Sequence, residues 1–211
     1  MFIEEKVRNY VDTVDSTSPT PGGGSVIALV GALASSLARM YAHLTLDKKS
    51  YAQLDETTRA GFEDSFFELS LIKEEMMKAV DQDAKAYTEV IQAYRLPKVT
   101  IDEIDFRTNK IQLATLSAIE VPQKTAEYAY KGMCLLDKLI PFGNKNAISD
   151  VVIAVHLLSC VVDCSIINME INISVLTDET KVSEYSKEIE ELVKKTSEKK
   201  EQLLELSKQF L

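Results

Sequence analysis

The stretch that decides the fold runs from residue 147 to residue 176 and reads AISDVVIAVHLLSCVVDCSIINMEINISVL. Apolar residues would occur on every side of a helix with this sequence, and such a helix must be surrounded by other helices. The chain contains no Asn-Gly or Asp-Gly turn and no strand-length alternation of apolar and polar residues. We therefore expect an all-α protein with 147–176 as its central helix.

Sparse turn signals set the lengths of the other helices. Prolines and glycines cluster at 19–24, at Pro97 and at 141–143, and the long gaps between these places are typical of long helices. The predicted helices are 3–14, 24–46, 55–95, 102–139 with a kink near Pro122, 147–176 and 178–208. No repeat or low-complexity linker divides the chain. We expect one domain over residues 1–211, an up-and-down bundle of about five to six long helices.

The overall charge limits the classes of partner. The chain carries 24 Lys and Arg against 33 Asp and Glu, a formal charge of −9, with 45% apolar and 27% charged residues. Nucleic acids and anionic membranes attract positive charge, so neither is an expected partner. The longest apolar runs, 26–37 and 151–162, hold about a dozen residues each and predict no membrane-spanning helix.

Cysteine usage and the N-terminal residues predict the compartment. Cys134, Cys160 and Cys164 are an odd number and lie in apolar runs, so we expect free, buried thiols in a reducing environment. Residues 1–10 lack the apolar segment of a signal peptide. Together these features predict a cytoplasmic protein.

A glycine-rich turn leads into the predicted helix 24–46. Residues 18–25 read SPTPGGGS, and three glycines at a helix start leave backbone N–H groups free to bind a carboxylate or phosphate. A tight turn capped by Ser25 explains the same residues equally well. Small residues then recur every fourth position and predict close packing against another helix of the chain or of a second copy. They are Gly24, Ala28, Ala32 and Ser36.

Asp83 is the best candidate for proton transfer. It lies between Val80 and Tyr87 on the apolar stripe of the predicted helix 55–95, so we expect it to face inward and Asp81 to face outward. A carboxylate among apolar neighbours has a raised pKa, which suits general acid–base catalysis. A structural carboxylate with a buried partner is the alternative.

Two groups of polar residues accompany the central helix. The segment 143–150 reads GNKNAISD, in which Asn146 or Ser149 can cap the helix and Asp150 lies in its first turn. Capping leaves the second asparagine of the segment unexplained, which favours a polar ligand pocket. Near the other end, Asn168 and Asn172 share one helix face and need hydrogen-bond partners from a neighbouring helix or a ligand.

The histidines and lysines offer less specific signals. His43 and His156 lie in apolar helices, and we expect His156 to be a core residue. The residue spacing predicts no zinc or other metal site. Lys48 and Lys49 are the best local cations for an anionic substrate, with a solvated loop as the alternative.

Several short strings, in order along residues 17–178, resemble the cyclodeaminase/cyclohydrolase family. This family includes the cyclodeaminase domain of formiminotransferase-cyclodeaminase and stand-alone methenyltetrahydrofolate cyclohydrolases. The matching strings are TPGGGS at 20–25, LT with KK and Tyr51 at 44–51, DQDA with Tyr87 at 81–87, LPK at 96–98, VP at 121–122, GNKN with SD at 143–150, and NMEIN at 168–172. The chain departs from the family pattern at His43 and at Asp47.

The resemblance implies an all-helical, dimer-forming folate enzyme that needs no metal and no cofactor besides its tetrahydrofolate substrate. Cyclodeamination and cyclohydrolysis both pass through a tetrahedral carbon between two nitrogens and need proton transfer. We expect Asp83 to act as the acid–base, Asp150 with the asparagines to recognise the pterin, and the glycine turn with the lysines to hold the glutamate carboxylates. The predicted catalytic residues are Asp83 and Asp150; the predicted substrate-binding residues are Gly22, Gly23, Gly24, Ser25, Lys48, Lys49, Asn144, Asn146 and Asn172.

Three functions remain open at this point. The first is formiminotetrahydrofolate cyclodeaminase, which converts 5-formiminotetrahydrofolate to 5,10-methenyltetrahydrofolate and ammonia. The second is methenyltetrahydrofolate cyclohydrolase, which opens 5,10-methenyltetrahydrofolate to 10-formyltetrahydrofolate. The third is a non-catalytic, folate-binding helical dimer. A purely structural helical dimer that binds no folate is the remaining non-enzymatic alternative.

Overall fold

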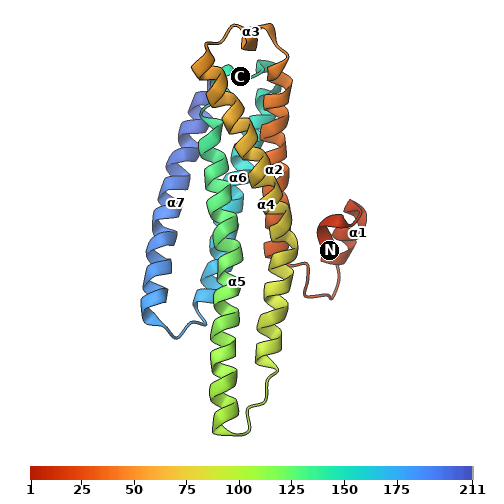
Figure 1. Ribbon diagram of the computed structural model, residues 1–211, viewed down its shortest axis with the longest axis vertical. Helices are drawn as coiled ribbons and strands as arrows, with labels where there is room; N and C mark the ends of the chain where they lie inside the picture. Colours follow the sequence, from red (N-terminus) through yellow and green to blue (C-terminus); the bar gives the residue numbers. More distant parts are fainter. Residues whose placement is uncertain (211) are drawn as a thin grey trace.

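The computed structural model describes residues 1–210 and has the predicted all-α architecture, with no strand in that range (Figure 1). Five long helices run up and down. The elements are η1 (Phe2–Glu4), α1 (Val7–Val14), α2 (Gly23–Leu46), α3 (Lys49–Ala52), α4 (Glu56–Tyr94), α5 (Ile101–Leu136), η2 (Ile140–Phe142), η3 (Lys145–Ala147), α6 (Ile148–Ile173) and α7 (Glu179–Lys208).

Helices α2, α4, α5 and α6 form a four-helix ring, because each packs against the next and α6 packs back against α2. Helix α7 packs on the outside, against α6 and α5. Its buried residues Ile189, Thr196 and Leu203 are spaced by seven, the interval at which side chains return to one helix face. The predicted amphipathic C-terminal helix is therefore a fifth bundle helix.

Side chains fix the starts of the long helices. Asp55 accepts a hydrogen bond from the Thr58 N–H at the start of α4. Thr100 and Glu103 form a capping box at the start of α5, and Asp178 caps α7. Each cap satisfies backbone donors that have no partner within the helix.

The N-terminal segment differs from the single helix predicted over 3–14. It forms η1 and the short helix α1, which stands beside the bundle in Figure 1. The Phe2 N–H donates a 2.6 Å hydrogen bond to Asp81 Oδ1, which fastens the segment to α4. Asp81 is therefore half-buried beneath this segment, although we expected it to face outward.

The central position of α6 is confirmed on three sides only. His156 and Cys160 are exposed, so the prediction that they are buried is wrong; the three cysteines are free. Both α2 and the 145–173 segment are long and apolar enough to cross a membrane, which the sequence analysis did not predict. The continuous apolar runs are short, but the isolated polar residues between them do little to lower the mean hydropathy of the whole helix. About half of each apolar window is buried within the bundle, where these helices pack against each other and against α4 and α5.

Candidate functional site

A pocket of about 340 Å³ opens where α2 begins against α4. Because α4, α5 and α6 all continue past the first residue of α2, they enclose this space from three sides. The lining residues are Pro19, Thr20, Gly22, Gly23, Gly24, Asp83, Ala86, Tyr87, Val90, Ala118, Pro122, Asn168, Ile171 and Asn172. The structure thus brings together five of the predicted site residues, which are Gly22, Gly23, Gly24, Asp83 and Asn172.

Asp83 is bound to the first turn of α2 through Ser25. The Ser25 N–H donates to Asp83 Oδ2 over 2.9 Å, so the helix start is occupied by a carboxylate of the protein itself. The Ser25 hydroxyl donates to the Val80 carbonyl over 2.7 Å and lies 3.2 Å from Asp83 Oδ2. A hydroxyl has one hydrogen, so the Ser25 hydroxyl divides its donation between the Val80 carbonyl and Asp83 Oδ2.

Burial raises the pKa of Asp83, and the two contacts from Ser25 oppose this shift without cancelling it. The cause is desolvation, which disfavours the ionised carboxylate. Asp83 faces inward, as predicted, and its carboxyl lines the pocket. A carboxyl with a raised pKa at the wall of a pocket is suited to accept a proton and return it.

Gly24 permits the close contact between α2 and α4. A Cβ at this position would lie 1.9 Å from Asp83 Oδ1 and 2.4 Å from its Cγ. The small-residue stripe continues at Ala28 and Ala32, which are buried. The stripe therefore packs within the chain, one of the two arrangements that its spacing allowed.

The opposite wall of the pocket depends on Pro122. Proline has no N–H, so Pro122 leaves the Ala118 carbonyl without its partner in α5. The Asn172 side-chain amide donates to this carbonyl over 3.4 Å and to the Asn168 carbonyl over 2.9 Å. The neighbouring helix α5 thus supplies a partner for the side-chain NH2 of Asn172. The side-chain oxygen of Asn172 remains as a hydrogen-bond acceptor, and Asn172 lines the pocket.

Tyr10 is a residue of this region that the sequence analysis missed. It is buried behind the first turn of α2, in contact with Ala28 and Val80. Burial, together with the charges of Asp83 and Asp81, raises the pKa of Tyr10 to about 12. Its hydroxyl has no partner among the described residues. Only the packing of α1 reveals this position, since no sequence motif surrounds it.

The other predicted site residues lie at the far end of the bundle. Lys48 and Lys49 follow α2, and Asp150 lies in the first turn of α6. With 24 residues in α2 and a rise of 1.5 Å per residue, this end is about 36 Å from the pocket. Within one chain, the single site predicted from the sequence is therefore divided into two clusters.

Loop structure accounts for the asparagines of the far cluster. Asn144 accepts from the Asn146 N–H, and its amide donates to the Leu44 carbonyl. Its own N–H donates to Thr45 over 2.9 Å. Asn144 therefore caps η3 and joins it to the end of α2, whereas α6 has no side-chain cap from Asn146 or Ser149.

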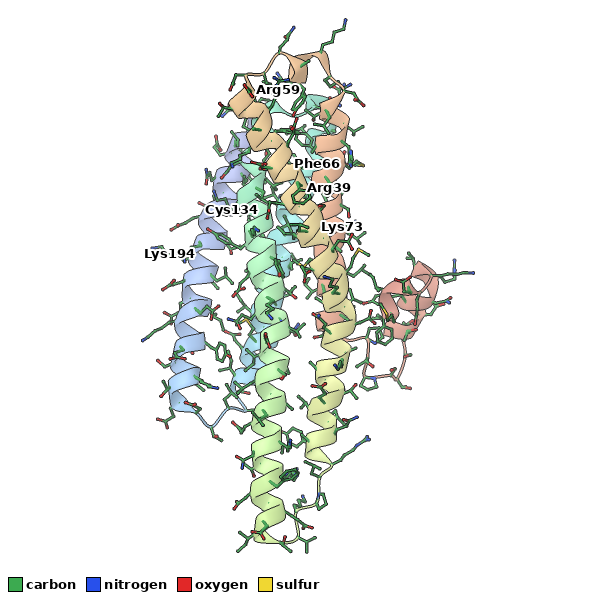
Figure 2. The ribbon with its side chains drawn as sticks, viewed as in Figure 1. Arg39, Arg59, Phe66, Lys73, Cys134 and Lys194 are labelled. Atoms are coloured by element: carbon green, nitrogen blue, oxygen red, sulfur yellow. The ribbon has the colours of Figure 1, made fainter. Side chains whose placement is uncertain are left out.

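A second polar contact between α2 and α4 lies outside the pocket, where Figure 2 shows Arg39 beside Phe66. The Arg39 guanidinium lies 4.0 Å from the centre of the Phe66 ring and donates to the Phe66 carbonyl. The His43 ring meets the same phenyl ring edge-on at 4.5 Å. In the described part of the chain, no three His, Cys, Asp or Glu side chains lie close enough to share a metal ion.

Comparison with known proteins shows what the chain resembles. Residues 6–191 match the family profile described as formiminotransferase-cyclodeaminase. The chain is 29% identical over 204 residues to the methenyltetrahydrofolate cyclohydrolase of Methylorubrum extorquens, covering 97% of this chain and 96% of that protein. It is 33% identical over 178 residues to the formimidoyltransferase-cyclodeaminase of Rattus norvegicus, covering 84% of this chain but 32% of that protein.

A solved structure extends the similarity to the fold. The formiminotetrahydrofolate cyclodeaminase from Thermotoga maritima superimposes with a TM-score of 0.80 at 27% identity. The superposition covers 99% of this chain and 96% of that chain. The arrangement of helices around the pocket is therefore shared over nearly the whole length of both chains.

Proposed function

Because the chain belongs to the formiminotransferase-cyclodeaminase family, we propose that it is an enzyme that closes 5-formiminotetrahydrofolate to 5,10-methenyltetrahydrofolate with release of ammonia. The observation that carries this proposal is the Asp83 carboxyl, held by Ser25 at the wall of a pocket. The chain spans about a third of the length of the formimidoyltransferase-cyclodeaminases that it matches. On this proposal the formimino group is transferred to the folate by a separate active site.

The reaction requires one proton to change places. N10 of the folate attacks the carbon of the protonated formimino group, which forms a tetrahedral carbon bonded to N5, N10 and an amino group. N10 then loses its proton, the amino group gains one, and the bond to the departing ammonia breaks. Asp83 accepts the N10 proton and returns it to the amino group, so the carboxyl ends in its starting state.

The remaining pocket residues position the substrate. Free N–H groups at Gly23 and Gly24 are donors, and the Asn172 side-chain oxygen is an acceptor for an N–H of the pterin. Since the steps consist of additions and proton transfers, the proposed reaction uses no cofactor besides the folate. We place it in the cytoplasm, where free thiols such as those of Cys134, Cys160 and Cys164 persist.

Methenyltetrahydrofolate cyclohydrolase is the second candidate. One observation favours it, because the cyclohydrolase of Methylorubrum extorquens matches this chain over nearly the full length of both proteins. Asp83 would then take a proton from water as the water adds to the methenyl carbon. The same carboxyl would return the proton to N5 as the bond between N5 and the carbon breaks. The hydroxyl proton of the intermediate would pass to solvent as the formyl C=O bond forms.

An ultraviolet assay with both substrates tests the proposal. We expect 5-formiminotetrahydrofolate to give the absorption band of 5,10-methenyltetrahydrofolate faster than in the absence of protein, with one ammonia released per turnover. Loss of that band from added 5,10-methenyltetrahydrofolate, without formimino turnover, would instead assign the cyclohydrolase. Folate binding without acceleration of either reaction would leave a non-catalytic binding protein.

We further propose that the enzyme is a homodimer built on the outer faces of α2 and α6. These helices pack against each other, and each leaves apolar side chains exposed. Ile167 is 54% exposed and Met40 is 40% exposed, which is unusual in helices of such apolar sequence. A second copy would cover these residues and complete the burial of α6 that its sequence predicts.

Sedimentation analysis tests the homodimer. We expect the wild-type protein to have twice the 23.6 kDa mass of one chain. Met40→Glu places a charge in the proposed interface and should raise the dimer dissociation constant by about tenfold or more. Val193→Glu, at an exposed apolar position of α7, is the matched control and should leave the mass unchanged. A monomeric wild-type protein would exclude this interface.

A further inference from the structure

The α4–α5 hairpin extends beyond the rest of the bundle and continues the pocket past Asp83. In Figure 1 this hairpin reaches well below the ends of α6 and α7. Since α2 begins opposite Asp83, the last three turns of α4 have no fourth helix in front of them. Their inward face is therefore available to a ligand that starts in the pocket.

The residues on that inward face follow from helix geometry. Asp83, Tyr87 and Val90 line the pocket, and Tyr94 shares their face because it lies eleven residues, three turns, after Asp83. Tyr87 is 41% exposed and Tyr94 is 44% exposed, so two aromatic rings border this groove. On the facing helix, Ala118 lines the pocket, and Arg107 lies three turns before it on the same face.

Arg107 closes the far end of the groove with a positive charge. Its Nε and Nη2 donate to the Tyr94 carbonyl over 3.3 and 3.1 Å, and its guanidinium lies 5.5 Å from the centre of the Tyr94 ring. No described carboxylate forms an ion pair with Arg107. Arginine has five N–H donors, so the contacts with Tyr94 fix its position and leave donors for a ligand.

We propose that this groove binds the p-aminobenzoyl-glutamate arm of the folate, with its ring between Tyr87 and Tyr94 and a glutamate carboxylate on Arg107. This inference rests on the proposed function, in which the pterin lies next to Asp83. Eleven residues of helix place Tyr94 about 16 Å from Asp83 along α4, which matches an extended arm. Lys48 and Lys49, which we first expected to hold the tail, lie about 36 Å away at the other end of α2.

The test compares tetrahydrofolate with tetrahydropteroate, which lacks the glutamate, as ligands in calorimetry. Wild-type protein should bind tetrahydrofolate about tenfold more tightly, because a charged hydrogen-bonded contact contributes at least this factor. In Arg107→Gln this preference should be lost, and in Arg107→Lys it should be partly kept. A merely structural role for Arg107 would weaken both ligands equally, and that result would overturn the proposal.

Two further variants locate the carboxylate site. Lys110 lies one turn from Arg107 but borders the other side of the hairpin, next to Leu96 and Phe106. Lys110→Gln removes the same charge and should keep the preference for the glutamylated ligand. The contrary result would be loss of the preference for tetrahydrofolate in a Lys48→Gln, Lys49→Gln double variant, while Arg107→Gln keeps that preference. It would place the tail at the opposite end of the bundle and overturn the proposal.

Binding separates this inference from the proposed function. Suppose that neither 5-formiminotetrahydrofolate nor 5,10-methenyltetrahydrofolate is turned over, but the wild-type protein prefers tetrahydrofolate to tetrahydropteroate and this preference depends on Arg107. The tail site then stands and the catalytic proposal fails. If turnover occurs and both ligands bind equally well, the catalytic proposal stands and the tail site fails.

Discussion

Replacing Asp83 with asparagine should lower kcat by about 100- to 10,000-fold, the usual contribution of a positioned acid–base group. Asparagine has nearly the same shape and its oxygen can still accept the Ser25 N–H, so the pocket keeps its form. What is lost is the ability to hold and release a proton. Stopped-flow or steady-state measurement of methenyl formation would record the loss.

The pH dependence gives an independent check on Asp83. Because burial raises its pKa, the acid limb of the wild-type kcat/KM profile should lie above the pH at which an ordinary aspartate titrates. The folded state then keeps a proton that the unfolded state has released, so the free energy of unfolding falls as pH rises through this range. Asp83→Asn should therefore abolish the acid limb of the kcat/KM profile. Its free energy of unfolding should also rise relative to that of the wild type as the pH increases through this range.

Asp81→Asn is the matched control for these experiments. Asp81 lies two residues away on α4, but its carboxylate accepts from the Phe2 N–H at the N-terminal segment instead of lining the pocket. Its substitution should change kcat by a much smaller factor. Equal losses in the two variants, or full turnover with an unchanged pH profile in Asp83→Asn, would remove the acid–base role from Asp83.

Local signals were sufficient to predict the long helices. The predicted ranges 55–95 and 178–208 agree with α4 and α7 to within one residue, because Asp55 and Asp178 are N-cap residues whose chemistry is readable from the sequence. The inward orientation of Asp83 likewise follows from the 3.6-residue period of α4. Such features depend on neighbours within one or two turns.

Contacts between distant segments could not be predicted in the same way. The hydrogen bond from Asn172 to the Ala118 carbonyl depends on Pro122 lying opposite α6, 54 residues away along the chain. Tyr10 reaches the back of the site only through the packing of α1. The separation of Asp150 from Asp83 is also a property of the bundle. Each of α2 and α6 has pocket residues at one end and residues of the far cluster at the other end.

Because α2 approaches α4 closely at Gly24, Gly24→Ala should lower both kcat and stability. The new Cβ would lie 1.9 Å from Asp83 Oδ1, so the carboxyl must rotate away from Ser25 or α2 must shift. Misplacement of a catalytic group by about 1 Å costs on the order of 100-fold in rate, and we expect kcat to fall by that factor. Overpacking should also lower the free energy of unfolding by about 1–3 kcal/mol.

Gly23→Ala separates this clash from other effects of removing a helical glycine. A Cβ at Gly23 meets no atom within 4 Å, so this variant should be at least as stable as wild type and lose far less activity than Gly24→Ala. A double-mutant cycle between positions 24 and 83 measures the contribution of the contact itself. In an Asp83→Ala background the obstructing carboxyl is gone, and Gly24→Ala should then cost little stability. If chemical denaturation shows the same cost in both backgrounds, the close contact of α2 with α4 is not what excludes a side chain at Gly24.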